Sequence, residues 1–233
     1  MTLEYQDWYK HDGNIAIHAD NLKVLRSMPD KCIDWGIIDP PIGLSRTEGV
    51  GKYGRQKQAG KLQKWDAKTP PKAFFRELFR ISKNQVIWCG QYFVLPPSRG
   101  WLVWDKGEGF YNRDFAECEL AWTSLDMNVR KFRYDPLARG DYKQKIHPCQ
   151  KPVSLYEWTF EACGIKPGMS IIDTHLGSGS SRIAAYFAGI QFTGIEADIE
   201  HYQEQEARYK REITKTRLIH TQPIIHPIQT TIL

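Results

Sequence analysis

The hydrophobic positions of the chain form short apolar runs that alternate with amphipathic stretches. Short apolar runs predict buried strands, and apolar residues that recur every three or four positions predict helices. Strands are expected at 15–18, 33–38, 85–89, 101–104, 117–123, 170–173 and 192–196, and helices at 21–28, 71–81, 154–163, 180–188 and 199–213. This alternation predicts an α/β, Rossmann-like fold, with a mostly parallel seven-stranded sheet and helices on both faces.

Two stretches do not fit the alternation. Residues 45–68 hold seven basic and two acidic side chains together with four glycines, which predicts a basic loop. Residues 128–146 interleave basic side chains with Phe132, Tyr134 and Tyr142. Either stretch alone is typical of a solvated loop. Both flank the motifs described next, and this position favours a functional role for them.

Composition narrows the class of protein. The 233 residues carry a formal net charge of +5, which permits a polyanionic partner without establishing one. We expect a single domain over 1–233. The five cysteines include no C-x-x-C pair, so neither a metal site nor a disulfide framework is expected. No apolar run approaches the ~20 residues of a membrane span, and the first residues do not resemble a signal peptide, so a cytoplasmic protein with no membrane partner is expected.

Two motifs follow apolar runs, where strands are expected to end. Asp39-Pro40-Pro41-Ile42 comes directly after Trp35–Ile38, and two prolines cannot continue a central strand. The chain must leave the sheet there, at the edge where open α/β sheets bind ligands. The second motif runs from Asp173 to Gly177-Ser178-Gly179, and the next expected strand ends at Glu196. Glycines allow close backbone approach to a nucleotide-like cofactor, and an acidic residue at that spacing suits ribose hydroxyls.

The third motif is His147-Pro148-Cys149-Gln150-Lys151-Pro152. With Asp39-Pro40-Pro41 before it and Asp173 with Gly177-Ser178-Gly179 after it, the chain resembles the β-class DNA amino-methyltransferases. These S-adenosylmethionine-dependent enzymes modify adenine N6 or cytosine N4 and have a permuted motif order. The resemblance covers about residues 14–212 and includes Asp20-Asn21 and Trp65-Asp66.

The resemblance implies roles for named positions. The catalytic tetrapeptide would be Asp39, Pro40, Pro41 and Ile42. S-adenosyl-L-methionine would be bound by Asp20, Asn21, Asp39, Lys151, Pro152, Asp173, His175, Gly177, Ser178, Gly179 and Glu196. The partner would be duplex DNA with a flipped-out base, contacted by Arg46, Lys52, Tyr53, Arg55, Lys57, Arg130, Lys131 and Arg133. No metal is implied.

The chain departs from the family pattern at two places. The family has an aromatic residue after the two prolines, where this chain has Ile42, and Pro-Phe after the aspartate, where this chain has Thr174-His175. An aliphatic side chain offers less than the ~1–3 kcal/mol of an aromatic stack on a base. Tyr53 in the basic loop is a candidate substitute. These departures also motivate a second hypothesis, a catalytically impaired nucleic-acid-binding protein on the same scaffold.

The target is expected to be adenine N6 in DNA, because the cytosine N4 enzymes of the family more often carry serine at the position of Asp39. Cytosine N4 is the alternative, and RNA remains open because basic and aromatic residues interleave at 128–146. A short target-recognition segment is expected at about 106–146. Family analogy allows a homodimer, in the cytoplasm of a bacterium or a phage host, inside or outside a restriction-modification system. The chain after Arg217 is expected to be a disordered end or an added edge strand.

Overall fold

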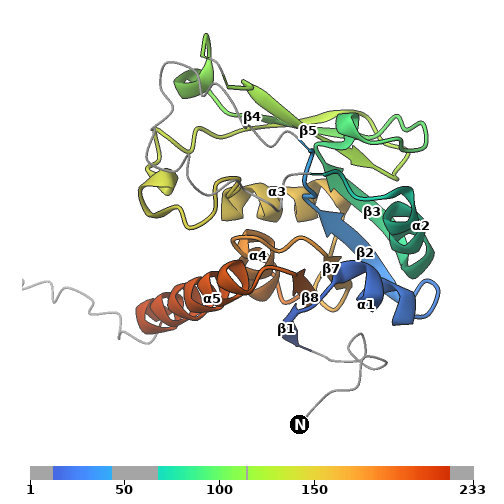
Figure 1. Cartoon of the computed structure of the whole chain (residues 1–233). Coiled ribbons are helices and arrows are strands. Elements are labelled where there is room, and N and C mark those ends of the chain that lie inside the picture. The colour runs from blue at the N-terminus through green and yellow to red at the C-terminus, as the bar shows by residue number, and fades with distance from the viewer. Residues whose placement is uncertain (1–12, 44–67, 114, 221–233) are drawn as a thin grey trace, which may run out of the picture.

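A computed structural model describes residues 13–43, 68–113 and 115–220 of the chain (Figure 1). Most of the predicted basic loop at 45–68 and the last residues, 221–233, lie outside this range. One sheet runs through the molecule in the order β1-β8-β7-β2-β3-β5-β4-β6. Its strands are β1 (Asn14–His18), β2 (Ile33–Ile38), β3 (Ser82–Trp88), β4 (Trp101–Asp105), β5 (Cys118–Thr123), β6 (Arg130–Arg133), β7 (Ser170–Asp173) and β8 (Gln191–Glu196).

Within the described ranges, five helices cover the two faces of this sheet (Figure 1). They are α1 (Asn21–Ser27), α2 (Lys72–Ile81), α3 (Val153–Cys163), α4 (Ser180–Phe187) and α5 (Ile199–His220), with 3-10 turns η4 (Gly90–Tyr92), η5 (Glu108–Phe110) and η6 (Asp141–Gln144). None of the helices in the described ranges is long and apolar enough to cross a membrane.

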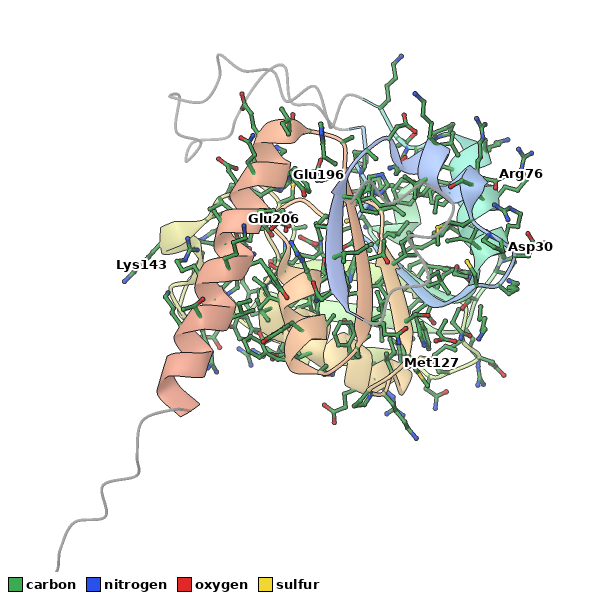
Figure 2. The ribbon with its side chains drawn as sticks, turned by 90° about the horizontal axis from the view of Figure 1, so that it is seen from below. Asp30, Arg76, Met127, Lys143, Glu196 and Glu206 are labelled. Carbon is green, nitrogen blue, oxygen red and sulfur yellow. The ribbon has the colours of Figure 1, made fainter. Side chains whose placement is uncertain are left out.

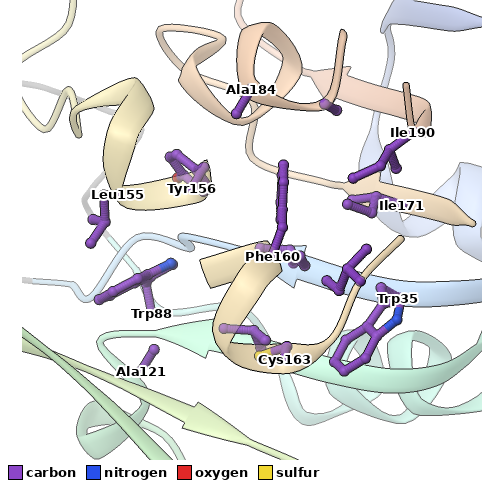
Figure 3. Close-up of a cluster of buried hydrophobic side chains, with 14 of the residues drawn as sticks. Trp35, Trp88, Ala121, Leu155, Tyr156, Phe160, Cys163, Ile171, Ala184 and Ile190 are labelled. Atoms are coloured by element: carbon purple, nitrogen blue, oxygen red, sulfur yellow. The ribbon is translucent and has the colours of Figure 1, made fainter. Parts of the chain in front are cut away.

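The central strands bury side chains on both faces, as the apolar runs of the sequence predict. Trp35 and Ile37 of β2 pack with α3 and α4, whereas Ile38, on the opposite face of the same strand, packs with α1 and α2. The first of these two clusters is shown in Figure 3, where Trp88 of β3 lies beside Tyr156 and Leu155 of α3. Burial on both faces explains why these strands read as continuous apolar runs.

The predicted α/β architecture is confirmed, with one correction to the strand count. The sheet has eight strands in the described part of the chain, not seven, because Arg130–Arg133 forms β6. This segment reads as a basic loop in sequence because three of its four side chains are charged and exposed. β6 pairs with β4 alone and lies at the edge of the sheet, where a strand needs little apolar surface. Helix α5 also continues past the predicted end at 213.

Strand direction decides which residues meet. β1, β8, β7, β2 and β3 are parallel, so their carboxyl ends share one edge of the sheet. β5 is antiparallel to β3 and to β4, so the start of β5 and the end of β4 lie at this same edge. Figure 2 shows Lys143, in η6 between β6 and α3, on the opposite side of the molecule from Asp30 and Arg76 near α1 and α2.

The turn after β3 fits tightly against β5, which yields a test of the fold. A Cβ atom at Gly90 would lie 2.6 Å from Trp122 Cβ and 3.1 Å from the Trp122 backbone nitrogen. We expect Gly90→Ala to lower the free energy of unfolding by about 1–3 kcal/mol, because overpacking displaces backbone. Gly13→Ala is the matched control, since a Cβ at Gly13 meets nothing within 4 Å. Urea unfolding of both variants measures the difference, and equal stability would contradict this packing.

Candidate active site

A cavity of about 610 Å³ opens at the carboxyl edge of the sheet. This volume lies within the ~300–1,000 Å³ typical of small-molecule sites. All three sequence motifs reach it. The predicted site residues that line it are Asn21, Asp39, Pro40, Pro41, Ile42, Lys151, His175, Gly177, Ser178 and Glu196. Residues that lie far apart in the sequence therefore share one space.

A buried network of four charges forms one wall of the cavity. Lys151 Nζ donates to Asp39 Oδ2 and lies 3.0 Å from Glu119 Oε2. Lys106 Nζ lies 2.7 Å from the other carboxylate oxygen, Glu119 Oε1. The Lys151 side chain is only 5% exposed. The network thus joins the end of β2, the segment before α3, the end of β4 and the start of β5.

Burial and charge act in opposite directions on these groups. Burial raises the pKa of Asp39 above its ordinary value, and the Lys151 ammonium opposes this shift. Burial alone would also raise the pKa of Glu119, but the two ammonium groups outweigh it and lower that pKa to about 2. Burial would lower the pKa of Lys151, yet Asp39 and Glu119 hold it well above the ordinary value. Lys151 and Glu119 are therefore fixed as ions, and Asp39 is the one carboxylate of this network whose pKa is raised.

The glycine turn after β7 and the end of β8 form another part of the cavity. Glu196, at the end of β8 (Figure 2), accepts the Gly177 N–H at 2.8 Å and the Asp198 N–H at 3.0 Å. Gly177 has φ +51°, and a Cβ there would lie 3.6 Å from the His147 ring. The His-Pro-x-x-Lys-Pro segment therefore lies against the glycine turn. Carboxylate oxygens have two lone pairs each, so Glu196 retains acceptor capacity for hydroxyl groups.

His175, which replaces the phenylalanine of the family pattern, links this turn to α1. Burial lowers the pKa of His175 to about 3, so the ring is neutral. Asn21 Nδ2 lies 3.0 Å from His175 Nε2, and Thr174 Oγ1 lies 3.0 Å from Nδ1. The ring also meets Phe74 of α2 edge-on, with centroids 5.1 Å apart. His175 thus keeps an aromatic packing contact and adds a polar contact that orients Asn21.

Four predicted cofactor residues do not line the cavity. Asp173 is buried beneath the turn, where it accepts from Ser181 Oγ at 2.6 Å and from the His175 N–H at 3.0 Å. Burial raises the pKa of Asp173 to about 7. Asp20 caps α1 by accepting the Lys23 N–H at 2.9 Å, while Pro152 and Gly179 are the N-cap residues directly before α3 and α4. In the structure these residues shape the turns around the cavity.

The predicted DNA-binding residues divide into two groups. The basic side chains of Arg130, Lys131 and Arg133 are exposed on β6. Arg133 Nη2 contacts Glu108 Oε1 at 2.7 Å, and Lys131 Nζ lies 3.6 Å from Asp105 Oδ2. The other five lie outside the described residues: Arg46, Lys52, Tyr53, Arg55 and Lys57.

Comparison with known protein families decides the identity. A family model described as DNA methylase, N6_N4_Mtase, matches residues 52–207, which is more than half of the chain. The chain belongs to this N6/N4 DNA methylase family. Two curated relatives are Type II methyltransferases. M2.DpnII of Streptococcus pneumoniae is 23% identical and aligns with 91% of this chain and 95% of its own. M.ScaI of Streptomyces caespitosus is 22% identical, over 81% of this chain and 79% of its own.

Solved structures show that the methylase has the fold of this family. The PvuII DNA methyltransferase, described as cytosine-N4-specific, superposes with a TM-score of 0.56 at 14% identity, over 91% of this chain and 94% of its own. M1.HpyAVI in complex with SAM superposes with a TM-score of 0.51 at 19% identity, over 83% of this chain and 98% of its own.

Two charged residues of the site, Lys106 and Glu119, are not predicted by the sequence motifs. Lys106 follows β4 and Glu119 is the second residue of β5, and neither belongs to one of the three motifs. The signal that could have found them is a charged residue close to the point where each strand of a predicted hairpin meets the connection between the strands. Recognising it requires knowing that β5 runs antiparallel to its neighbours.

The network yields a stability prediction for the methylase. We expect Glu119→Gln to lower the free energy of unfolding by about 3 kcal/mol at pH 7, because Lys106 and Lys151 lose a buried carboxylate. The pKa of Glu119 is lowered from an ordinary 4.5 to about 2, so its charge stabilises the fold at neutral pH and this contribution is lost as the pH falls between these values. The difference in the free energy of unfolding between wild type and Glu119→Gln should therefore become smaller as the pH falls through this range.

The measurement is urea unfolding at several pH values. Lys83→Met is the control, because the Lys83 side chain is 55% exposed and its ion pair with Asp34 should contribute less than about 1 kcal/mol. An effect of Glu119→Gln no larger than that of the control would contradict a stabilising role for the network.

Proposed function

We propose that the chain transfers a methyl group from S-adenosyl-L-methionine to the N6 amino group of an adenine flipped out of duplex DNA. The observation that supports this most strongly is the position of Asp39 and Pro40. They follow β2 directly and line the same cavity as the glycine turn after β7, with Asp39 held by Lys151.

The chemistry requires two hydrogen-bond acceptors side by side. An exocyclic amino group is a poor nucleophile because its lone pair is delocalised into the ring. The Asp39 carboxylate and the Pro40 carbonyl accept its two N–H groups, so that the nitrogen becomes pyramidal and its lone pair points away from them. Positive charge develops on the nitrogen as the methyl group arrives, and the Asp39 carboxylate stabilises it. The nitrogen then releases one proton toward the carboxylate or water.

Lys151 and Glu119 act on this step through Asp39. Lys151 occupies Asp39 Oδ2, so the carboxylate is fixed in one orientation before the base arrives. The ammonium also favours the ionised form of Asp39, which burial disfavours. Glu119 neutralises part of the charge of Lys151, which leaves Asp39 enough negative charge to attract the amino group. Lys151 and Glu119 are therefore positioning residues.

The other part of the cavity suits the cofactor, whose sulfonium supplies an activated methyl group. Glu196 lies next to the glycine turn, where nucleotide-like ligands bind in doubly wound sheets. Its carboxylate would accept the ribose hydroxyls, and Asn21, oriented by His175, would meet the adenine. Gly177 and Ser178, which line the cavity at the glycine turn, would contact the methionine portion.

DNA is the substrate class of the family, and the charges on β6 suit it. Arg130, Lys131 and Arg133 would neutralise phosphates beside the flipped base, which helps offset the few kcal/mol that extrusion costs. Adenine is preferred to cytosine because of Asp39, since serine is more frequent there among the cytosine N4 enzymes of the family.

The proposal predicts one specific product. Purified protein incubated with methyl-labelled S-adenosylmethionine and unmethylated DNA should yield N6-methyladenine when the DNA is digested and analysed by mass spectrometry. Asp39→Ala should reduce transfer by at least about a hundredfold while cofactor binding, measured by calorimetry, stays near that of wild type. If the label is found in N4-methylcytosine, the proposed mechanism still holds and the target base is cytosine. Cofactor binding without any labelled DNA or RNA would instead support a binding protein.

The pH profile tests the role of Lys151. Transfer requires ionised Asp39, so the rate falls on the acid side as pH drops through the pKa of this group. Removing the neighbouring ammonium raises that pKa further, because burial is then unopposed. We expect Lys151→Met to move the acid limb of the kcat profile to higher pH. Lys151→Arg, which keeps the charge, is the control. An acid limb that does not shift in Lys151→Met would contradict the role of Lys151 in keeping Asp39 ionised.

A further inference from the structure

Ile42 lines the cavity where relatives place an aromatic ring, so a flipped base lacks its usual stacking partner at this position. We propose that Phe115, in the connection between β4 and β5, supplies the ring on which the base stacks, with Phe110 of the same connection completing an aromatic wall. The inference rests on the proposed methyltransferase function and identifies how this site holds its target base.

The exposure of Phe115 is the first observation. This ring lines the cavity and is nevertheless 43% exposed. Leu137, on the β6–α3 connection, lines the same cavity and is 41% exposed. A large apolar side chain that borders a cavity is in contact with water. When a flat, apolar ligand covers it, apolar surface leaves the water, and this stabilises the complex. Phe110, by contrast, is buried and gives the wall its interior part.

Two carboxylates anchor the connection that carries these rings. Asp105 Oδ1 accepts the Gly107 N–H at 3.0 Å and the Tyr111 hydroxyl at 2.8 Å. Asp135 Oδ2 accepts the Gly109 N–H at 2.8 Å, and its other oxygen accepts the Leu137 and Ala138 N–H groups. Asp135 therefore ties the Phe110 side of the cavity to the Leu137 side. These contacts position Phe110, the interior ring of the wall, before the base arrives.

Glycines make this anchoring possible. A Cβ atom at Gly109 would lie 2.6 Å from Asp135 Oδ2, and one at Gly107 would lie 2.8 Å from Asp135 Cβ. Gly107 also has φ +78°, which other residues rarely adopt. The sequence Lys106-Gly107-Glu108-Gly109-Phe110 is thus a turn whose small residues let a carboxylate approach the backbone.

The aromatic wall is connected to the acceptor end of the site. Lys106 Nζ lies 5.3 Å from the centroid of the Phe110 ring and binds Glu119, which in turn contacts Lys151 beside Asp39. Tyr142 adds a further ring, edge-on to Phe110 with centroids 6.4 Å apart. A base whose amino group meets Asp39 therefore shares the cavity with rings contributed by the β4–β5 connection.

The test compares two variants of Phe115, one that keeps an aromatic ring and one that keeps only an apolar side chain of similar size. Phe115→Leu keeps an apolar side chain without a π face, and Phe115→Tyr keeps the face. We expect Phe115→Leu to lower kcat/KM for DNA by about 10- to 100-fold, and Phe115→Tyr to stay near wild type. Cofactor binding should be unchanged in both. Ile42→Phe, added to Phe115→Leu, should restore most of the lost activity by returning the ring to the family position.

A fluorescence readout distinguishes stacking from a structural role. Once the methylated position in wild-type product is mapped, a duplex with 2-aminopurine at that position reports base extrusion. Its emission should stay low with wild type, where the ring quenches the flipped base, and rise with Phe115→Leu. Equal emission together with unchanged kcat/KM in Phe115→Leu would overturn the inference and leave the proposed function intact. Absence of methylation by wild type would overturn the proposed function itself.

Discussion

Pairing of buried charges is the constraint on which the site depends. Four ionic groups stand at the inner wall of the cavity, and ions removed from water are tolerated only when each meets an opposite charge. The requirement ties together segments that are remote in sequence: the ends of β2 and β4, the start of β5 and the segment before α3. The same contacts that give each buried charge an oppositely charged partner also fix the orientation of Asp39. Stability and the proposed catalytic geometry are therefore two results of one arrangement.

Much of the fold is readable from the sequence because the central strands are buried on both faces. Their continuous apolar runs predict strands at positions such as 33–38 and 170–173 that the structure reproduces. β6 is missed because an edge strand can be charged throughout and still form its ladder. The motif residues around Asp39 and Gly177 are predictable as neighbours, since strand ends converge. Glu119 is not, because its place depends on the reversed direction of β5, which no local pattern encodes.

The two departures from the family pattern have different structural consequences. At position 175, where the family pattern has a phenyl ring, an imidazole packs edge-on against Phe74, and its nitrogens contact Asn21 and Thr174. At position 42, an aliphatic side chain cannot reproduce a flat ring. The surrounding cavity is nevertheless rich in aromatic residues that come from other segments. A motif read one position at a time therefore underestimates what the complete site supplies.

The edge position of β6 has a consequence beyond the recognition of a substrate. An edge strand leaves a row of backbone donors and acceptors that a strand from another molecule could extend into an intermolecular sheet. Arg130, Lys131 and Arg133 place positive charge along this row, and two like-charged edges repel each other. Basic side chains at this edge thus oppose edge-to-edge pairing of two copies through β6, whether or not any polyanion is present.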